Sequence, residues 1–102
     1  MTTNQRVATT ILEQLGGRRF IAMTGANSFA SGDSMLTFKL PSRSTKNNIR
    51  GVRVTLTPAD DYTVEFLKMR GFEVVTVSKS EGIYADMLQE VFTEATGLYT
   101  RL

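Results

Sequence analysis

The chain has 102 residues, 12 of them basic and 10 acidic, and it contains no histidine, cysteine or tryptophan. A chain of this length forms one small domain with a single modest core. We expect this domain to span residues 1–102 and to be of the α+β class. Without cysteine there is no disulfide framework, thiol nucleophile or thiolate metal site, and without histidine the commonest general base and transition-metal ligand are missing. We therefore expect a protein without catalytic residues, metal ligands or a cofactor.

The hydropathy pattern shows no membrane segment. No run approaches the ~18 consecutive apolar residues that identify a membrane helix. The first residues also lack the apolar stretch of a secretory signal. We expect a cytoplasmic protein.

The first third of the chain predicts a helix followed by a strand. Apolar side chains within residues 3–15 recur at intervals of three and four, which is typical of an amphipathic helix. The pair of glycines that follows supplies a helix stop. Residues 18–24 alternate with the two-residue period of a strand, and they are the first strand candidate. Gly, Asn, Ser and Asp dominate residues 25–33, which we interpret as a loop.

Four later segments carry apolar residues at every second position and predict further strands. They span residues 35–40, 52–57, 62–67 and 72–77. Ser78 and Glu81 then have the spacing of a capping box, which predicts the start of a C-terminal helix. A broad apolar stripe from Ile83 to Ala95 continues this helix, and Gly97 ends it.

These elements predict an α+β fold with the order α-β-β-β-β-β-α. Most links between the strands are short, and short links join antiparallel strands because parallel pairs need a long crossover. We therefore expect a five-stranded antiparallel meander, with the N-terminal and the C-terminal helix packed on one face. The other face of the sheet is then left bare.

Two stretches of the sequence have a distinctive order of residues. Gly-Gly-Arg-Arg-Phe-Ile-Ala-Met-Thr-Gly-Ala fills residues 16–26, and Phe-Thr-Glu-Ala-Thr-Gly-Leu-Tyr-Thr fills residues 92–100. Together with shorter matches at residues 38–41 and 62–66, they resemble a family of small proteins encoded by phages and prophages. The resemblance spans nearly the whole chain and implies a phage accessory protein in the host cell. It carries over no catalytic residue.

The charges are unevenly divided along the chain. Residues 1–57 carry eight basic and two acidic side chains, whereas residues 58–102 carry four basic and eight acidic ones. A basic segment joins the second and third predicted strands, and it is a candidate nucleic-acid interface because phosphate contacts need only mobile cations. Its cations are Lys39, Arg43, Lys46, Arg50 and Arg53. No aromatic residue interleaves with them, and a solvated loop explains the same charges.

Two other surfaces are candidates for a protein partner. The bare sheet face is rich in threonine, and the C-terminal helix carries acids at intervals of four. The residues concerned are Thr37, Thr55, Thr57 and Thr63 on the sheet, and Asp86, Glu90 and Glu94 on the helix. Strand propensity explains the threonines, and a solvated helix face explains the acids. The function stays open between nucleic-acid binding and a protein–protein module, either a homo-oligomer or an inhibitor of a host or defence protein.

Overall fold

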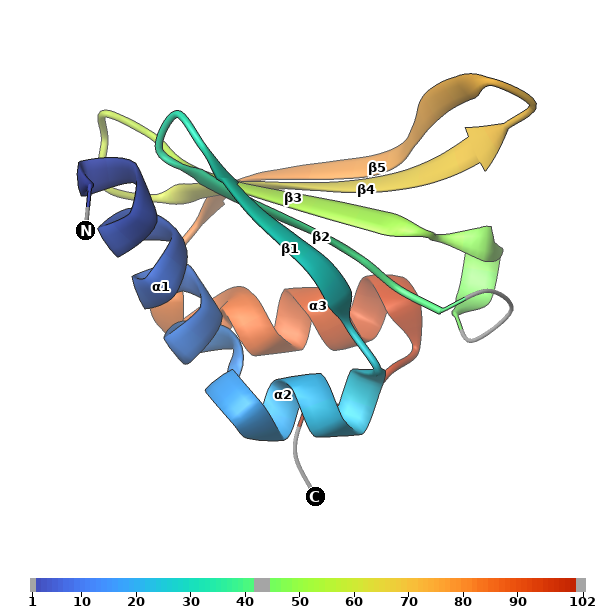
Figure 1. Cartoon of the computed structure of the whole chain (residues 1–102), viewed down its shortest axis with the longest axis horizontal. Coiled ribbons are helices and arrows are strands. Elements are labelled where there is room, and N and C mark those ends of the chain that lie inside the picture. Colours follow the sequence, from blue (N-terminus) through green and yellow to red (C-terminus); the bar gives the residue numbers. More distant parts are fainter. Residues whose placement is uncertain (1, 42–44, 101–102) are drawn as a thin grey trace.

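The protein has two layers, one of helices and one formed by a sheet (Figure 1). The structure is a computed structural model that describes residues 2–41 and 45–100. Within them the elements in chain order are α1 (Thr3–Leu15), α2 (Gly17–Thr24), β1 (Asn27–Gly32), β2 (Met35–Lys39), the 3-10 turn η1 (Lys46–Asn48), β3 (Gly51–Leu56), β4 (Tyr62–Arg70), β5 (Glu73–Ile83), the 3-10 turn η2 (Ala85–Met87) and α3 (Leu88–Thr96). The strands lie in the order β1-β2-β3-β4-β5, and every neighbouring pair is antiparallel. The α+β class and the five-stranded meander are therefore confirmed.

Helix α1 begins and ends where the sequence predicts. The Thr2 hydroxyl accepts a hydrogen bond from the Gln5 backbone N–H at 3.2 Å, and the Gln5 side chain accepts one from the Thr2 N–H at 2.9 Å. This capping box satisfies two backbone donors at the start of the helix. Ile11 and Leu15 are buried one turn apart, so the apolar stripe of α1 faces the core.

The segment 18–24 is wrongly predicted, because it forms helix α2 and not a strand. Burial distinguishes the two: Phe20 and Thr24, four residues apart, are buried, whereas Ala22 between them is exposed. Positive φ angles at the two preceding glycines turn the chain and let a second helix start. A short apolar run is compatible with both the helical period and the two-residue period of a strand, and packing against the core decides which of the two forms.

The predicted loop at residues 25–33 contains strand β1, which pairs with β2 at the edge of the sheet. Its sequence, Asn-Ser-Phe-Ala-Ser-Gly, has low strand propensity, and the ladder is irregular near Ser28, whose φ is 54°. The ring of Phe29 lies 5.4 Å from the ring of Phe38 on β2. Pairing with β2 and this ring contact hold the segment extended despite its composition.

The C-terminal helix starts later than predicted. Strand β5 runs through the expected capping box, since Ser78 pairs with Phe66 and Lys79 pairs with Glu65 on β4. A partner strand of nine residues holds this segment extended, whereas a capping box satisfies only two donors. Helix α3 begins at Leu88, after η2. None of the described helices is long and apolar enough to cross a membrane.

The core lies between the helices and one face of the sheet. The rings of Phe20 on α2 and Phe92 on α3 meet edge to face at 5.1 Å, and Phe20 meets Phe38 at 5.4 Å. The inward side chains of β3 and β4, among them Val54 and Phe66, are fully buried. Alternation along the strands places every second side chain on the opposite face. No described helix covers this open face (Figure 1).

The hairpin of β4 and β5 extends beyond the two layers. Strand β5 has 11 residues, whereas β3 has six. In Figure 1 the turn of this hairpin, at the upper right, reaches past α3 and bends away from the helices. Residues 68–75, which we call the arm, therefore protrude from the body on the side of the open face.

Candidate nucleic-acid interface

The open face of the sheet carries a groove with a volume of about 400 Å³. Its lining includes residues of all five strands, so residues far apart in the sequence meet there. The cations among them are Lys39, Arg50, Arg53 and Lys68, and the outward apolar side chains are Leu67, Met69 and Val74. None of the described residues that line the groove is acidic. The groove is therefore both basic and partly apolar.

The strand register explains why the sheet is hollow at this point. Lys39 pairs with Gly51 and Gly51 pairs with Leu67, so the three lie in one row across the sheet. A Cβ placed on Gly51 would lie 3.8 Å from the Leu67 Cβ and 3.7 Å from the Phe38 carbonyl oxygen. The glycine thus leaves a gap in the outward row, and the arm bounds the same gap through Met69 and Val74.

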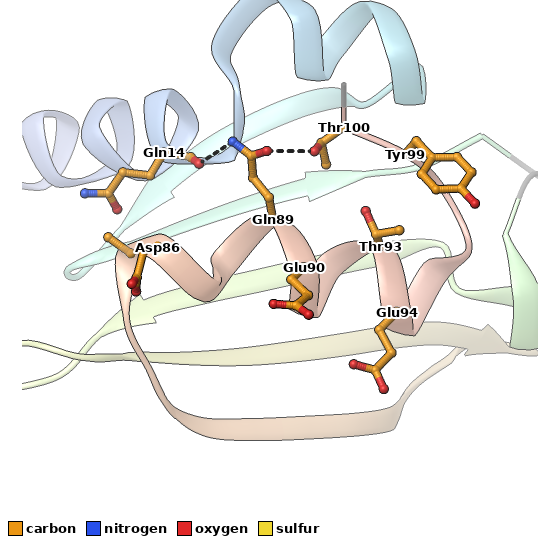
Figure 2. Close-up of a pocket in the computed structure, with 9 residues that line it drawn as sticks. Gln14, Asp86, Gln89, Glu90, Thr93, Glu94, Tyr99 and Thr100 are labelled. Carbon is orange, nitrogen blue, oxygen red and sulfur yellow. Dashed lines mark hydrogen bonds between the residues drawn. The ribbon is translucent and has the colours of Figure 1, made fainter. Parts of the chain in front are cut away.

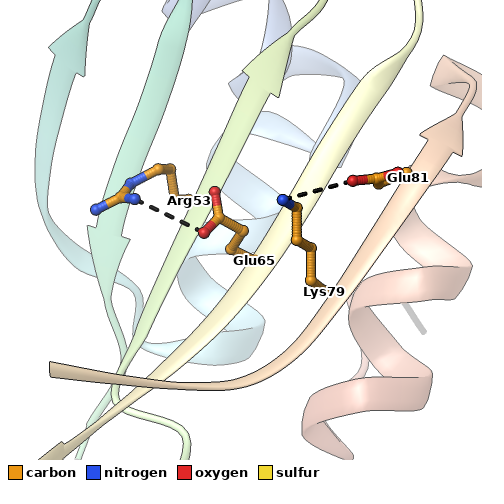
Figure 3. Close-up of polar contacts among 4 residues, drawn as sticks. All are labelled: Arg53, Glu65, Lys79 and Glu81. Carbon is orange, nitrogen blue, oxygen red and sulfur yellow. Dashed lines mark ion pairs between the residues drawn. The ribbon is translucent and has the colours of Figure 1, made fainter.

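The groove brings together three of the predicted phosphate-binding cations, Lys39, Arg50 and Arg53. The Lys39 and Arg50 side chains are exposed. Arg53 pairs with Glu65, whose carboxylate lies 3.7 Å from the guanidinium, and the two side chains are 40% and 20% exposed (Figure 3). An ion pair of this length in contact with solvent is weak. Arg53 therefore keeps guanidinium donors for a phosphate.

Beyond Arg53 the charges alternate across the sheet. Arg53 pairs in register with Glu65, and Glu65 pairs with Lys79. The Lys79 Nζ in turn lies 3.4 Å from the Glu81 Oε1 (Figure 3). Each positive charge in this row has a negative neighbour, so the row attracts a polyanion weakly. The groove, by contrast, combines several cations with a lining free of acids in the described part of the chain.

The other two predicted cations do not belong to the groove. Lys46 lies on η1, and its side-chain stem passes 3.7 Å from the point where a Cβ on Gly97 would sit. It therefore lies beside the C-terminal end of α3, where the helix dipole favours a positive charge. Arg43 falls outside the described residues.

The apolar half of the groove was missed from the sequence. Leu67 and Met69 continue the outward phase of Thr63 and Glu65 on β4, so alternation alone places them on the open face. Val74 pairs with Met69 across the arm. Leu67 and Met69, two apolar residues at outward positions of one strand, are the feature of the sequence that indicates this surface.

The predicted threonines divide between the open face and a turn. Thr55 pairs with Thr63, and Thr37 pairs with Arg53 and lines the groove. Thr57 lies after β3, where its hydroxyl donates to the Asp61 Oδ1 at 2.6 Å and accepts from the Ala59 N–H at 3.2 Å. Both bonds shape the β3–β4 turn, so Thr57 has a structural role there.

The predicted acids line a second groove, of about 1170 Å³, beside α3 and the C-terminal segment. Asp86 lies on η2, whereas Glu90 and Glu94 lie on α3, and all three are exposed. Figure 2 shows that the Glu90 and Glu94 carboxylates point away from the polar side chains on the other side of α3. In the described part of the chain no three acidic side chains come together as a group that could hold a metal ion. This row has the geometry of a solvated helix face.

A chain of hydrogen bonds accounts for the polar side of the second groove. The Gln89 Nε2 donates to the Gln14 carbonyl oxygen at 3.1 Å, and the Thr100 hydroxyl donates to the Gln89 Oε1 at 3.0 Å (Figure 2). The Tyr62 hydroxyl donates to the Gln14 side-chain oxygen at 2.6 Å. Burial raises the pKa of Tyr62, and the hydrogen bond with Gln14 partly offsets this effect. These bonds tie α1, β4, α3 and the C-terminal segment together, so they serve the fold.

The fold and the groove define a small α+β protein with a basic, partly apolar surface on an open sheet. Comparison of the chain with family models, curated proteins and solved structures finds no match.

Proposed function

We propose that the protein binds nucleic acid on the open face of its sheet, with Lys39, Arg50 and Arg53 contacting phosphates. The observation that carries this proposal is the convergence of these cations, from two strands and a loop, on one groove whose described lining contains no acid. Phosphate contacts are electrostatic and supply most of the affinity of sequence-independent binding. A gathered set of cations is the footprint of such an interface.

The sequence resemblance supports a biological setting for this activity. We infer from it that the protein is a phage accessory protein that acts in the cytoplasm of the host cell. Recovery of nucleic acid with a tagged copy from infected cells tests the activity in this setting, and its absence from such material contradicts the activity.

Titration of labelled DNA and RNA followed by fluorescence anisotropy tests the binding directly. We expect the affinity to fall steeply between about 50 mM and about 200 mM salt, because bound cations release counterions from the nucleic acid. The double variant Lys39→Glu/Arg50→Glu should lose binding and show a smaller salt dependence, by about 0.7–0.9 in slope for each phosphate contact removed.

The matched control is Arg6→Glu/Arg19→Glu, which changes the net charge equally. Both side chains are exposed and lie on helices α1 and α2, outside the groove lining. This control should keep most of the affinity. An equal loss in both variants means that only the net charge matters, and no binding of any DNA or RNA at low salt refutes the proposal.

The arm favours a second candidate function, association with a protein. Phe72 is fully exposed, Met69 and Val74 are 53% and 61% exposed, and β5 is an edge strand of the sheet. Exposed apolar side chains and open strand edges are typical of protein contacts. The partner is then a second copy of the chain or a host or defence protein that is inhibited. Light scattering at high protein concentration tests the first of these, since a monomer mass excludes a homo-oligomer.

A further inference from the structure

The tip of the arm presents an aromatic side chain that the fold does not use. Arg70 pairs with Glu73, which leaves Gly71 and Phe72 as a two-residue loop, and Gly71 has a φ of 65°. A positive φ at the first loop position favours glycine there. This turn does not require a particular residue type at the second loop position. Phe72 is nonetheless a phenylalanine, and its ring is fully exposed. The ring is therefore accessible to a molecule outside the chain.

Phe72 does not itself line the groove, but it lies three residues from Met69 and two from Val74, which form part of the apolar lining. Met69 and Val74 pair across the arm on its outward side, and both line the groove together with Leu67. Lys68 and Arg70 flank this surface, opposed by Glu73 alone within residues 68–75. An exposed aromatic ring, an apolar track and neighbouring cations are the parts from which proteins build a surface for unpaired bases.

We propose, on the basis of the function proposed above, that the ligand is single-stranded nucleic acid and that one of its bases stacks on Phe72. A duplex keeps the faces of its bases stacked within the helix, so it offers none to an exposed ring. A groove of about 400 Å³ has the size of a site for a small molecule, so it can receive a nucleotide but not the cross-section of a duplex. A single strand exposes the faces of its bases and follows a groove of this size with its phosphates on the cations.

Stacking is tested with a single strand that carries the fluorescent base 2-aminopurine, whose emission falls when it stacks. The chain has no tryptophan, so the protein contributes little emission of its own. We expect wild-type protein to quench the probe. Phe72→Leu should remove the quenching and weaken binding about 5- to 150-fold, the range found for the loss of one stacked base, whereas Phe72→Tyr should retain both.

The salt dependence separates stacking from phosphate contact. Phe72→Leu removes no cation, so its affinity should fall with salt at the wild-type slope. The matched control is Tyr99→Leu, which alters another exposed aromatic residue, in the second groove, and should leave both affinity and quenching unchanged. Because Phe72 has no buried contact, the variants should fold as the wild type does, which circular dichroism verifies.

The outcomes distinguish this inference from the function on which it rests. If Lys39→Glu/Arg50→Glu abolishes binding while Phe72→Leu binds and quenches like the wild type, base stacking on the arm is refuted and the basic groove stands. Tighter binding of a duplex than of a single strand overturns the inference in the same way. If no nucleic acid binds at all, both fail. If Phe72→Leu only converts an oligomer into a monomer, the arm is a protein contact and the inference is wrong.

Discussion

Replacement of Gly51 by valine should change the affinity for the ligand and the stability of the fold in opposite directions. Gly51 lies on the open side of β3, and its φ is not among the positive values of the chain. A Cβ there would have its nearest neighbours at 3.7–3.8 Å, the Phe38 carbonyl oxygen and the Leu67 Cβ. These are ordinary van der Waals distances, so the Cβ of a residue at position 51 fits without moving a neighbour, and we expect the fold to accept Gly51→Val.

The expected effect on stability is a gain. Glycine inside a strand costs roughly 0.5–1 kcal/mol relative to alanine, because its unfolded chain has more freedom to lose. Valine adds a preference for strands. For a chain of this size a gain of about 1 kcal/mol raises the Tm by roughly 4–8 °C. Thermal unfolding followed by circular dichroism measures this shift.

The expected effect on binding has the opposite sign. The valine methyl groups fill the gap in the row between Lys39 and Leu67, where the ligand has to lie. Displacing the ligand from this floor removes the burial of about one apolar side chain, roughly 1.5–3 kcal/mol, which corresponds to about a 10- to 150-fold weaker affinity. Anisotropy titration with single-stranded DNA at constant salt measures it.

Thr55→Val provides the matched control, since Thr55 lies on the same face of β3 outside the groove lining. It should change neither the affinity nor the salt dependence. A stabilised Gly51→Val protein with wild-type affinity shows that the ligand does not use the groove. A destabilisation of more than about 1 kcal/mol refutes the steric reasoning, because it means that the Cβ has no room.

Three further predictions concern the core, a buried hydroxyl and the Arg53–Glu65 ion pair beside the groove. Phe92→Ala should lower the free energy of unfolding by about 3–5 kcal/mol in urea denaturation, because it empties a fully buried site; a loss under about 1 kcal/mol contradicts the ring cluster. Tyr62→Phe should cost about 1 kcal/mol at neutral pH through the lost bond to Gln14. Because burial raises the pKa of Tyr62 above its ordinary value of 10.0, the wild type should lose stability as the pH rises beyond that value, and the variant should lose less; equal slopes in the two proteins refute this. Glu65→Gln should strengthen nucleic-acid binding by up to about fivefold, because it frees Arg53 from a weak pair, and weaker binding than the wild type is the contrary result.

The sequence predicts the elements whose local signals agree with their packing. Residues 3–15 have an apolar stripe and a polar residue to cap it, and the helix forms with those bounds. The strands at residues 35–40, 52–57 and 62–67 are found because one buried face imposes strict alternation. Residues 18–24 form a helix where a strand is expected, since so short a segment does not distinguish the helical period from the strand period. Residues 25–33, expected as a loop, contain strand β1, because pairing at the sheet edge overrides composition.

Only the part of the candidate site that depends on strand alternation can be predicted from the sequence. Alternation assigns Lys39 and Arg53 to the open face, and strand pairing then brings them together. Lys46 lies outside the groove because the turn η1 places it beside the end of α3. This is a tertiary contact that no local sequence pattern encodes. The depth of the groove depends on the absence of a side chain at Gly51 and on the bend of the arm, and both become visible only when the strand register is known.

The order of the strands also shapes the way the chain reaches its native state. Every strand pairs with its neighbour in sequence, so the sheet is assembled from hairpins, and proteins rich in such local contacts fold quickly. The core closes by a distant contact, because α3 brings Phe92 back against Phe20. Until α3 has docked, the Phe20 ring lacks its edge-to-face contact with Phe92, and this part of the core is open to water.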